Sequence, residues 1–302
     1  MKTTVRYRFV TVLMVLAIFV AAAVIIFVLM KETPEEIDPH AGQVYIYDGF
    51  DWIWMTPLEG VPANQLKEEH FRNDDGKISY IGTDYEVLRG IDVSEHQLEI
   101  DWQQVAGADI DYAYVRVGRR GYTEGGLFED EYFKANVKGA HEAGLDVGVY
   151  MFSQAITVQE AIEEARFALE RVEGNNVTLP IVFDWEQTSV DGSRTADATG
   201  EQITSYASAF CKKIAKAGYT AGVYFNRSLG YNYYDLEQLK DFEFWLAEYR
   251  SVPAFYYNFG LWQYSDNAQV QGIDDECKLV VRFDGESRPA ALNSGEVSVR
   301  LL

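Results

Sequence analysis

The strongest constraint on the fold is an alternation of short apolar runs with amphipathic segments that begins at Gly90. Between the runs, apolar residues recur at helical spacing, as they do from Ile203 to Ala217. Parallel neighbouring strands need crossover helices of this kind. The pattern therefore predicts five βα units whose strands lie at residues 90–93, 112–117, 147–152, 179–185 and 221–225.

After Phe225 the pattern becomes strand-like and leaves little room for helices, with runs at 244–249, 259–264 and 277–283. Eight strands over about 195 residues favour an α/β closed barrel whose last part has lost its helices. An open doubly wound sheet is the alternative fold. It would need a glycine-rich phosphate loop after the first strand, and residues 90–95 (GIDVSE) do not form one.

The N-terminus carries an uncharged stretch of 22 residues, 9–30. As a helix it would be roughly 33 Å long, enough to cross a bilayer. A signal peptide cleaved near residues 21–23 is the alternative, but cleavage there would leave a strongly apolar new N-terminus. Basic residues precede the stretch and mainly acidic residues follow it, so we expect residues 1–8 in the cytoplasm and residues 32–302 outside.

The segments around the barrel have distinct compositions. Residues 31–43 contain two prolines and several acids and are expected to form a stalk. Residues 44–88 are rich in aromatics with short apolar bursts and predict a small strand-rich extension. The barrel is expected over 89–284, and residues 285–302 are assigned to a C-terminal tail.

The charge balance excludes some classes of protein. The chain has 26 basic and 47 acidic residues, a net charge of −21, which argues against a nucleic-acid partner. Its four histidines and two cysteines show no metal-ligand spacing, so no metal and no cofactor are predicted. Free buried thiols are expected at Cys211 and Cys277, with a single disulfide between them as the alternative.

Three carboxylates fall at predicted strand ends, where parallel barrels place their chemistry. Asp92 ends the first strand, and Asp184 and Glu186 end the fourth. Because side chains alternate along a strand, Asp184 and Glu186 share one side and suppress each other's ionisation. One protonated and one charged carboxyl suit glycoside hydrolysis. The alternative is that they form salt bridges or cap a helix.

Aromatic residues gather at or near the same strand ends. Faces of this kind can stack on sugar rings, and as a set around carboxylates they favour a saccharide cleft. They are Tyr150, Phe152, Tyr224, Trp245, Trp262 and Tyr264.

The order of these motifs resembles glycoside hydrolase family 25, the Chalaropsis-type lysozymes. The resemblance covers about residues 89–280 and rests on GIDVSEHQ at 90–97, IDW at 100–102, YVRVG at 114–118, FKAN at 133–136, GVYMF at 148–152, LPIVFDWE at 179–186, GVY at 222–224 and LWQY at 261–264. It implies a (β/α)5(β)3 barrel of the TIM-like type. It also implies an N-acetylmuramidase that cleaves the β-1,4 bond between N-acetylmuramic acid and N-acetylglucosamine in peptidoglycan.

The resemblance also implies roles for single residues. Glu186 resembles the general acid, and Asp184 the carboxylate that orients the 2-acetamido group and stabilises its cyclised intermediate. Asp92 resembles a supporting carboxylate, and Tyr150 the substrate-contacting tyrosine. Further substrate contacts are expected from Arg116, Phe152, Tyr224, Trp262 and Tyr264.

One position departs from the family pattern. In residues 272–278 (GIDDECK), Lys278 stands where the family usually carries an aspartate, unless a shifted loop brings Asp274 or Asp275 there. A cation at this place can lower the pKa of Glu186 and weaken it as an acid. A non-catalytic peptidoglycan-binding or scaffold protein is therefore the alternative function, and a hydrolase of another N-acetylated glycan is a third. The sequence does not predict an oligomeric state.

Overall fold

The computed structural model describes residues 2–30 and 38–285. The chain divides into two compact units, residues 1–44 and 45–302. The first unit contains helix α1 (Lys2–Leu29), within which Val10–Val28 is long and apolar enough to cross a membrane. The predicted stalk lies outside the described residues between 31 and 37, and the predicted tail lies outside them from residue 286.

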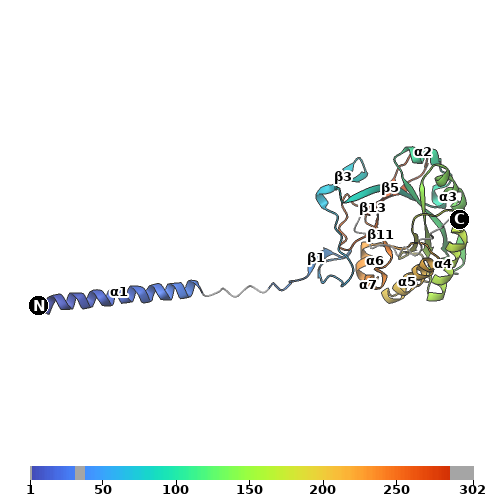
Figure 1. Ribbon diagram of the computed structural model, residues 1–302. Helices are drawn as coiled ribbons and strands as arrows, with labels where there is room; N and C mark the ends of the chain where they lie inside the picture. The colour runs from blue at the N-terminus through green and yellow to red at the C-terminus, as the bar shows by residue number, and fades with distance from the viewer. Residues whose placement is uncertain (1, 31–37, 286–302) are drawn as a thin grey trace, which may run out of the picture. The chain divides into compact units, whose positions relative to one another are not determined.

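The second unit contains a closed barrel of eight strands (Figure 1). Neighbouring strands are parallel from β5 through β12, whereas β13 runs antiparallel between β12 and β5 and closes the ring. The prediction of a closed barrel is confirmed, and the open doubly wound sheet is wrong. The strands are β5 (Tyr85–Val93), β6 (Tyr112–Arg120), β8 (Asp146–Ser153), β9 (Ile181–Trp185), β10 (Ala221–Asn226), β11 (Glu243–Ala247), β12 (Leu261–Ala268) and β13 (Cys277–Gly285).

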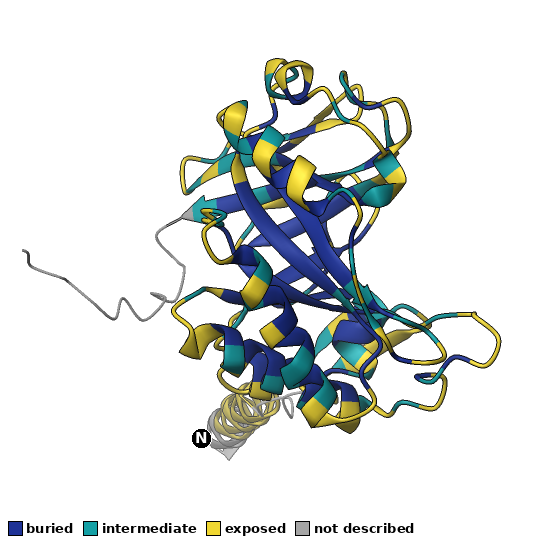
Figure 2. Cartoon of the chain, turned by 90° about the vertical axis from the view of Figure 1, so that its right-hand side faces the viewer, coloured by how far each residue is buried: buried dark blue, intermediate teal, exposed yellow. Residues whose placement is uncertain are grey.

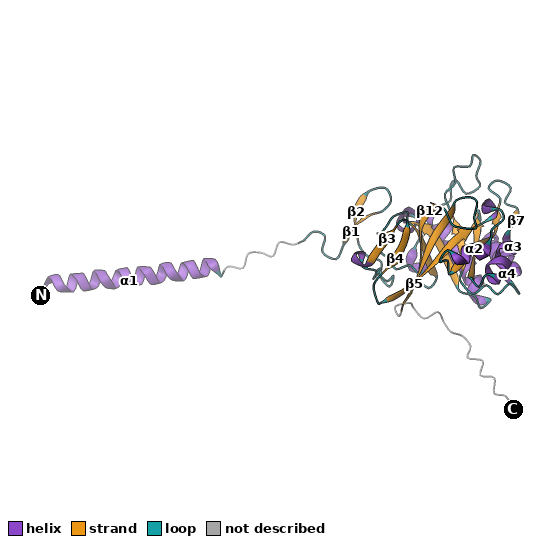
Figure 3. Ribbon diagram, turned by 90° about the horizontal axis from the view of Figure 1, so that it is seen from above, coloured by secondary structure: helices purple, strands orange, loops and turns teal. Residues whose placement is uncertain are grey.

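Helices connect the earlier strands and lie outside the sheet (Figure 3). Thr157 and Thr199 begin the two longest of these, because each threonine hydroxyl accepts a backbone N–H of the first turn. A short strand, β7 (Leu127–Glu129), pairs with the end of β6. The helices are α2 (Trp102–Gly107), α3 (Phe133–Glu142), α4 (Val158–Val172), α5 (Gly200–Lys216), α6 (Arg227–Asn232) and α7 (Leu236–Leu239).

Alternation along each strand divides the core into two layers, and the barrel strands are buried over most of their length (Figure 2). One layer fills the barrel interior and includes Tyr112, Tyr114 and Trp245. The other lies between the strands and the elements around them. Gly90 is required in the inner layer, because a Cβ at this position would collide with the ring of Tyr112.

Two hairpins precede the barrel. One pairs β1 (Val44–Tyr47) with β2 (Trp52–Met55), and the other pairs β3 (Phe71–Asp74) with β4 (Lys77–Tyr80). The ring of Phe71 lies 5.7 Å from that of Trp262 and 6.1 Å from that of Phe283, both on barrel strands. The β3–β4 hairpin therefore packs on the outside of the barrel and shares its core.

We predict that Phe71→Ala lowers the free energy of unfolding by about 3 to 4 kcal/mol, because it leaves a cavity between the β3–β4 hairpin and the barrel. Chemical denaturation followed by near-UV circular dichroism measures the loss. Phe50→Ala is the matched control, since Phe50 is 61% exposed and its loss is expected to stay below about 0.5 kcal/mol. Equal effects of the two changes would contradict a shared core.

Candidate active site

A cavity of about 490 Å³ opens at the carboxyl ends of the barrel strands. The three carboxylates predicted from the sequence, on Asp92, Asp184 and Glu186, all line it. Trp185 lies in the outer layer of the core, which places Asp184 and Glu186 together on the inner side as strand alternation predicts. The cavity also exposes Arg116, Tyr150, Phe152 and Lys278.

The Asp184 and Glu186 carboxylates are not engaged as structural groups. Among residues 2–30 and 38–285, neither caps a helix nor forms an ion pair, so the structural alternative for this pair is wrong. Asp184 is buried, and its Oδ1 accepts no hydrogen bond from the part of the chain that the structure describes. A buried carboxylate oxygen without a hydrogen-bond partner is rare in folded proteins and marks Asp184 as a candidate functional group.

Burial controls the ionisation of this pair. Loss of solvent raises the pKa of Asp184 well above its ordinary value, and the neighbouring Glu186 charge raises it further. Burial also raises the pKa of Glu186, although Lys278 opposes that effect. Because the two groups titrate together, their pKa values describe the pair and not either residue alone. We therefore expect the pair to retain one proton near neutral pH.

A series of hydrogen bonds, which the sequence did not predict, holds Asp92 in place. The Gln263 amide donates to Asp92 Oδ2 at 2.7 Å, and Gln263 Oε1 accepts from the hydroxyls of Tyr224 at 3.1 Å and Tyr249 at 2.9 Å. Gln263 stands inside the LWQY motif but is 171 residues from Asp92 in sequence. Burial raises the pKa of Asp92, whereas Lys278 and the hydrogen bond from Tyr150 lower it.

Lys278 faces the carboxylates. It lies directly opposite Asp92 in the antiparallel pairing of β13 with β5, and its Nζ is 3.9 Å from Asp92 Oδ2. Asp274 and Asp275 are exposed in the preceding turn and do not line the cavity. The cation expected at this position is thus inside the site, where the surrounding carboxylates raise the pKa of the Lys278 ammonium and keep it charged.

Arg116 is fixed at the cavity wall by two acidic partners. Its Nε donates to Asp130 Oδ2 at 2.8 Å, and its terminal nitrogen lies 2.9 Å from Glu95 Oε1. Asp130 also accepts the backbone N–H groups of Glu95 and Tyr132, which fixes the turn after β5. Asp130 and Glu95 were not predicted, because a pairing between distant segments leaves no local sequence pattern.

The structure separates the predicted aromatic contacts into three groups. Tyr150 and Phe152 line the cavity. Tyr224 and Trp245 lie inside the barrel, where Tyr224 acts through Gln263. The prediction that Trp262 and Tyr264 contact substrate is wrong: both belong to the outer layer, and the Trp262 indole donates to the backbone of Glu248. Gln263, which stands between them, takes the inward position.

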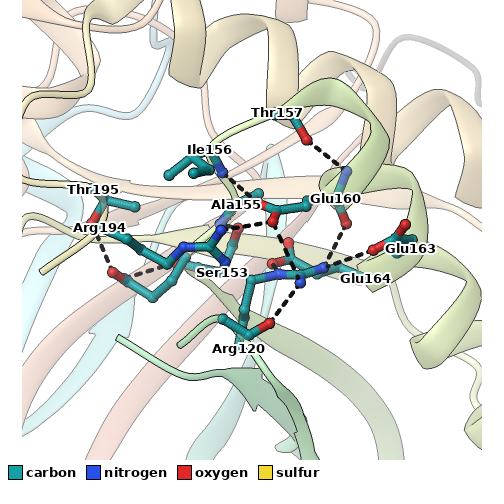
Figure 4. Close-up of polar contacts among 12 residues, drawn as sticks. Arg120, Ser153, Ala155, Ile156, Thr157, Glu160, Glu163, Glu164, Arg194 and Thr195 are labelled. Atoms are coloured by element: carbon teal, nitrogen blue, oxygen red, sulfur yellow. Dashed lines mark hydrogen bonds and ion pairs between the residues drawn. The ribbon is translucent and has the colours of Figure 1, made fainter. Parts of the chain in front are cut away.

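A buried ionic network supports the segment that follows Glu186 (Figure 4). Arg120 on β6 donates from Nε to Glu164 Oε1 at 2.7 Å, on α4. Glu160 of the same helix accepts from Arg194 at 2.7 Å, and Arg194 belongs to the loop between β9 and α5. Burial raises the pKa of Glu164 to about 7, and Arg120 opposes that rise. The network thus joins the loop after Glu186 to β6 and α4.

The two cysteines are free and buried, so the disulfide alternative is wrong. Cys211 donates its thiol to the carbonyl of Gly222. Cys277 contributes to the rim of the cavity but packs in the outer layer of the core, and burial raises the pKa of its thiol to about 12. A thiol with such a pKa carries almost no thiolate at neutral pH, so it is a poor nucleophile.

Residues 91–273 match the sequence profile of glycosyl hydrolases family 25. The chain belongs to this family. It is 29% identical over 198 residues to the uncharacterized protein YegX of Escherichia coli K12. This match covers 62% of this chain and 66% of YegX. It is 26% identical over 203 residues to lysozyme M1 of Streptomyces globisporus, covering 63% of this chain and 65% of that one. The match therefore spans about two thirds of the length of these relatives.

Solved structures show the same fold. The modular autolysin LytC of Streptococcus pneumoniae superposes with a TM-score of 0.60 at 23% identity, over 80% of this chain and 57% of LytC. The lysozyme of Streptomyces coelicolor superposes with a TM-score of 0.52 at 23% identity, over 66% of this chain and 93% of that one. The cavity thus lies in a glycoside hydrolase fold with an eight-stranded barrel.

We predict that Arg120→Met lowers the free energy of unfolding by about 3 kcal/mol, because Glu164 is left buried without its cation. The loss should be larger at pH 8 than at pH 5. The pKa of Glu164 is raised to about 7 in the folded chain even though Arg120 lowers it, so without Arg120 that pKa rises further. Ionising Glu164 at pH 8 then costs the folded chain more free energy than it costs the unfolded chain. Urea denaturation at the two pH values measures both effects.

Lys138→Met is the control for this change, since it removes an exposed ion pair with Glu142 and should cost less than about 0.5 kcal/mol. A loss from Arg120→Met that is no larger than the control would show that the network does not stabilise the fold.

Proposed function

We propose that this chain is an N-acetylmuramidase that cleaves the β-1,4 bond between N-acetylmuramic acid and N-acetylglucosamine in peptidoglycan. The observation that carries the proposal is the buried pair Asp184 and Glu186, which lines a cavity of saccharide size and includes a carboxylate oxygen without a hydrogen-bond partner among the described residues. The names of the relatives support it, because they include a lysozyme and an autolytic lysozyme. LytC, which has the same fold, was solved with a synthetic peptidoglycan ligand.

In this mechanism Glu186 donates its proton to the glycosidic oxygen as the bond breaks. Asp184 accepts a hydrogen bond from the substrate acetamido N–H, so that the acetamido oxygen attacks the anomeric carbon and forms a cyclic intermediate. Water then opens that intermediate, with the deprotonated Glu186 as base. Asp92 on β5 and Tyr150 on β8, the strand beside β9, support Asp184, and Arg116 and Phe152 contact the sugar.

The remaining proposals concern the type of barrel and the roles of the segments before it. We assign the barrel at 89–284 to the (β/α)5(β)3 type, which the order of helices and strands supports. Residues 9–30 serve as an uncleaved membrane anchor with residues 1–8 in the cytoplasm, 31–43 as a stalk, and 44–88 as an extension whose last residues, 85–88, begin barrel strand β5. The apolar helix Val10–Val28 supports the anchor. The site then acts outside the cell on peptidoglycan glycan strands.

We predict that Glu186→Gln lowers the release of muropeptides from purified peptidoglycan by about 1,000-fold, because the substituted amide cannot donate a proton to the leaving oxygen. Asp266→Asn is the matched control, since Asp266 also lines the cavity but is exposed and takes no part in the proposed steps; its rate should stay within about threefold of the parent chain. Borohydride reduction and mass spectrometry of the products should show N-acetylmuramic acid at the new reducing ends.

Three results would contradict parts of this account. No release by the unaltered chain would favour a non-catalytic peptidoglycan-binding protein, which the cation Lys278 in the site also favours. Faster cleavage of chitin oligomers than of peptidoglycan would favour another N-acetylated substrate. A covalent sugar trapped on Asp184 would exclude the acetamido route.

We predict that Lys278→Met moves the alkaline limit of the rate profile upward by about one pH unit. Lys278 lowers the pKa of Glu186, so its removal raises that pKa and keeps the acid protonated at higher pH. Rates measured between pH 4 and pH 9 test this. Lys134→Met, at an exposed lysine on α3, should leave the profile in place. A downward shift, or none, would show that Lys278 does not set the acidity of the site.

A further inference from the structure

An aromatic platform lies on the β1–β2 hairpin, outside the part of the chain that matches the family. It consists of Tyr45, Trp52 and Trp54, which are 54%, 62% and 45% exposed. The ring of Tyr45 stacks on Trp52 at 5.3 Å and lies 5.0 Å from Trp54. Large aromatic faces exposed together on a folded surface usually mark a binding site.

The hairpin that carries the platform is fixed to the barrel. Asn232 on α6 donates to the backbone oxygen of Asp48 in the hairpin turn, at 3.1 Å. Gly49 has a φ of +110° and approaches Ser228 so closely that an added Cβ would lie 2.8 Å from the serine Cβ. The Arg227 guanidinium lies 5.1 Å from the Tyr47 ring centre. The platform is therefore held in a defined position.

Basic residues border the platform. A cavity of about 440 Å³ beside it is lined by Tyr45, Tyr47 and Trp52 together with Arg227 and Arg250. Both arginines pair with the same carboxylate oxygen of Glu248, at 3.0 and 3.3 Å. Two guanidinium groups share this one acid, and the Arg250 side chain is 47% exposed, so it can reach a ligand on the platform.

The platform lies on the catalytic side of the barrel. Arg227 directly follows β10, and Arg250 comes three residues after β11, at the carboxyl ends of these strands. Between Glu248 and Arg250, Tyr249 donates to Gln263, which in turn holds Asp92 in the catalytic cavity. One short segment thus connects the platform border to the active site.

We propose that this platform is a second glycan subsite, which stacks on sugar rings of the same polymer that enters the catalytic cavity and contacts its carboxylates through Arg250. The proposal rests on the proposed function for the identity of the polymer. Aromatic faces beside charged hydrogen-bond donors suit a sugar chain with acidic substituents.

The test measures binding without turnover. Full-length chain carrying Glu186→Gln, in detergent, is mixed with purified peptidoglycan and its bound fraction is determined by sedimentation. Adding Trp52→Ala should weaken binding by about tenfold, and Trp52→Tyr should restore it to within about threefold because a stacking ring remains. Ile81→Ala is the control, since Ile81 is 58% exposed on another loop and should leave binding unchanged.

Equal binding with and without Trp52→Ala would overturn the proposal, and so would an absence of binding by the Glu186→Gln chain. A lipid role would appear as quenching of tryptophan emission by brominated lipid in nanodiscs that Trp52→Ala removes while peptidoglycan binding persists; that result also overturns the proposal. Because the binding test needs no cleavage, binding that depends on Trp52 together with no release of muropeptides by the chain that retains Glu186 would contradict the hydrolase function alone.

Discussion

The chemistry of this protein depends on the burial of several carboxylates at one end of a barrel. Asp92, Asp184 and Glu186 converge there because two strands, β5 and β9, present inward-facing positions at their carboxyl ends. Burial disfavours the charged form of each, and their mutual repulsion adds to that cost. Two cations offset part of it: Lys278 on the strand that closes the barrel, and Arg116 on β6. The site therefore combines a retained proton with retained negative charge.

Closure by an antiparallel strand places that cation. In the register of β13 against β5, Lys278 lies opposite Asp92, and alternation then sends its neighbours Cys277 and Leu279 to the outer layer of the core. The same strand carries Phe283, against which the β3–β4 hairpin packs. One strand thus links the electrostatics of the active site to the stability of the segment that precedes the barrel.

The sequence predicted the parts of this structure that local patterns encode. The alternation of runs and helices indicated the barrel, and the spacing of Asp184 and Glu186 indicated a shared face. Trp262 and Tyr264 were misassigned because an aromatic residue near a strand end does not reveal which way it points. Gln263, which lies between them on the strand, points inward and donates to Asp92, so its two neighbours point outward. The partners Asp130 and Gln263 could not be predicted, because each contacts its partner, Arg116 or Asp92, only in the folded barrel.

The central claim is that Asp184 and Glu186 together hold one proton at neutral pH. Carbon-13 NMR titration of the side-chain carboxyls, assigned with Asp184→Asn and Glu186→Gln, measures it directly. The account predicts two coupled steps, with one of them above the ordinary range for a carboxylic acid. Two independent titrations near the usual values of about 4 would contradict it.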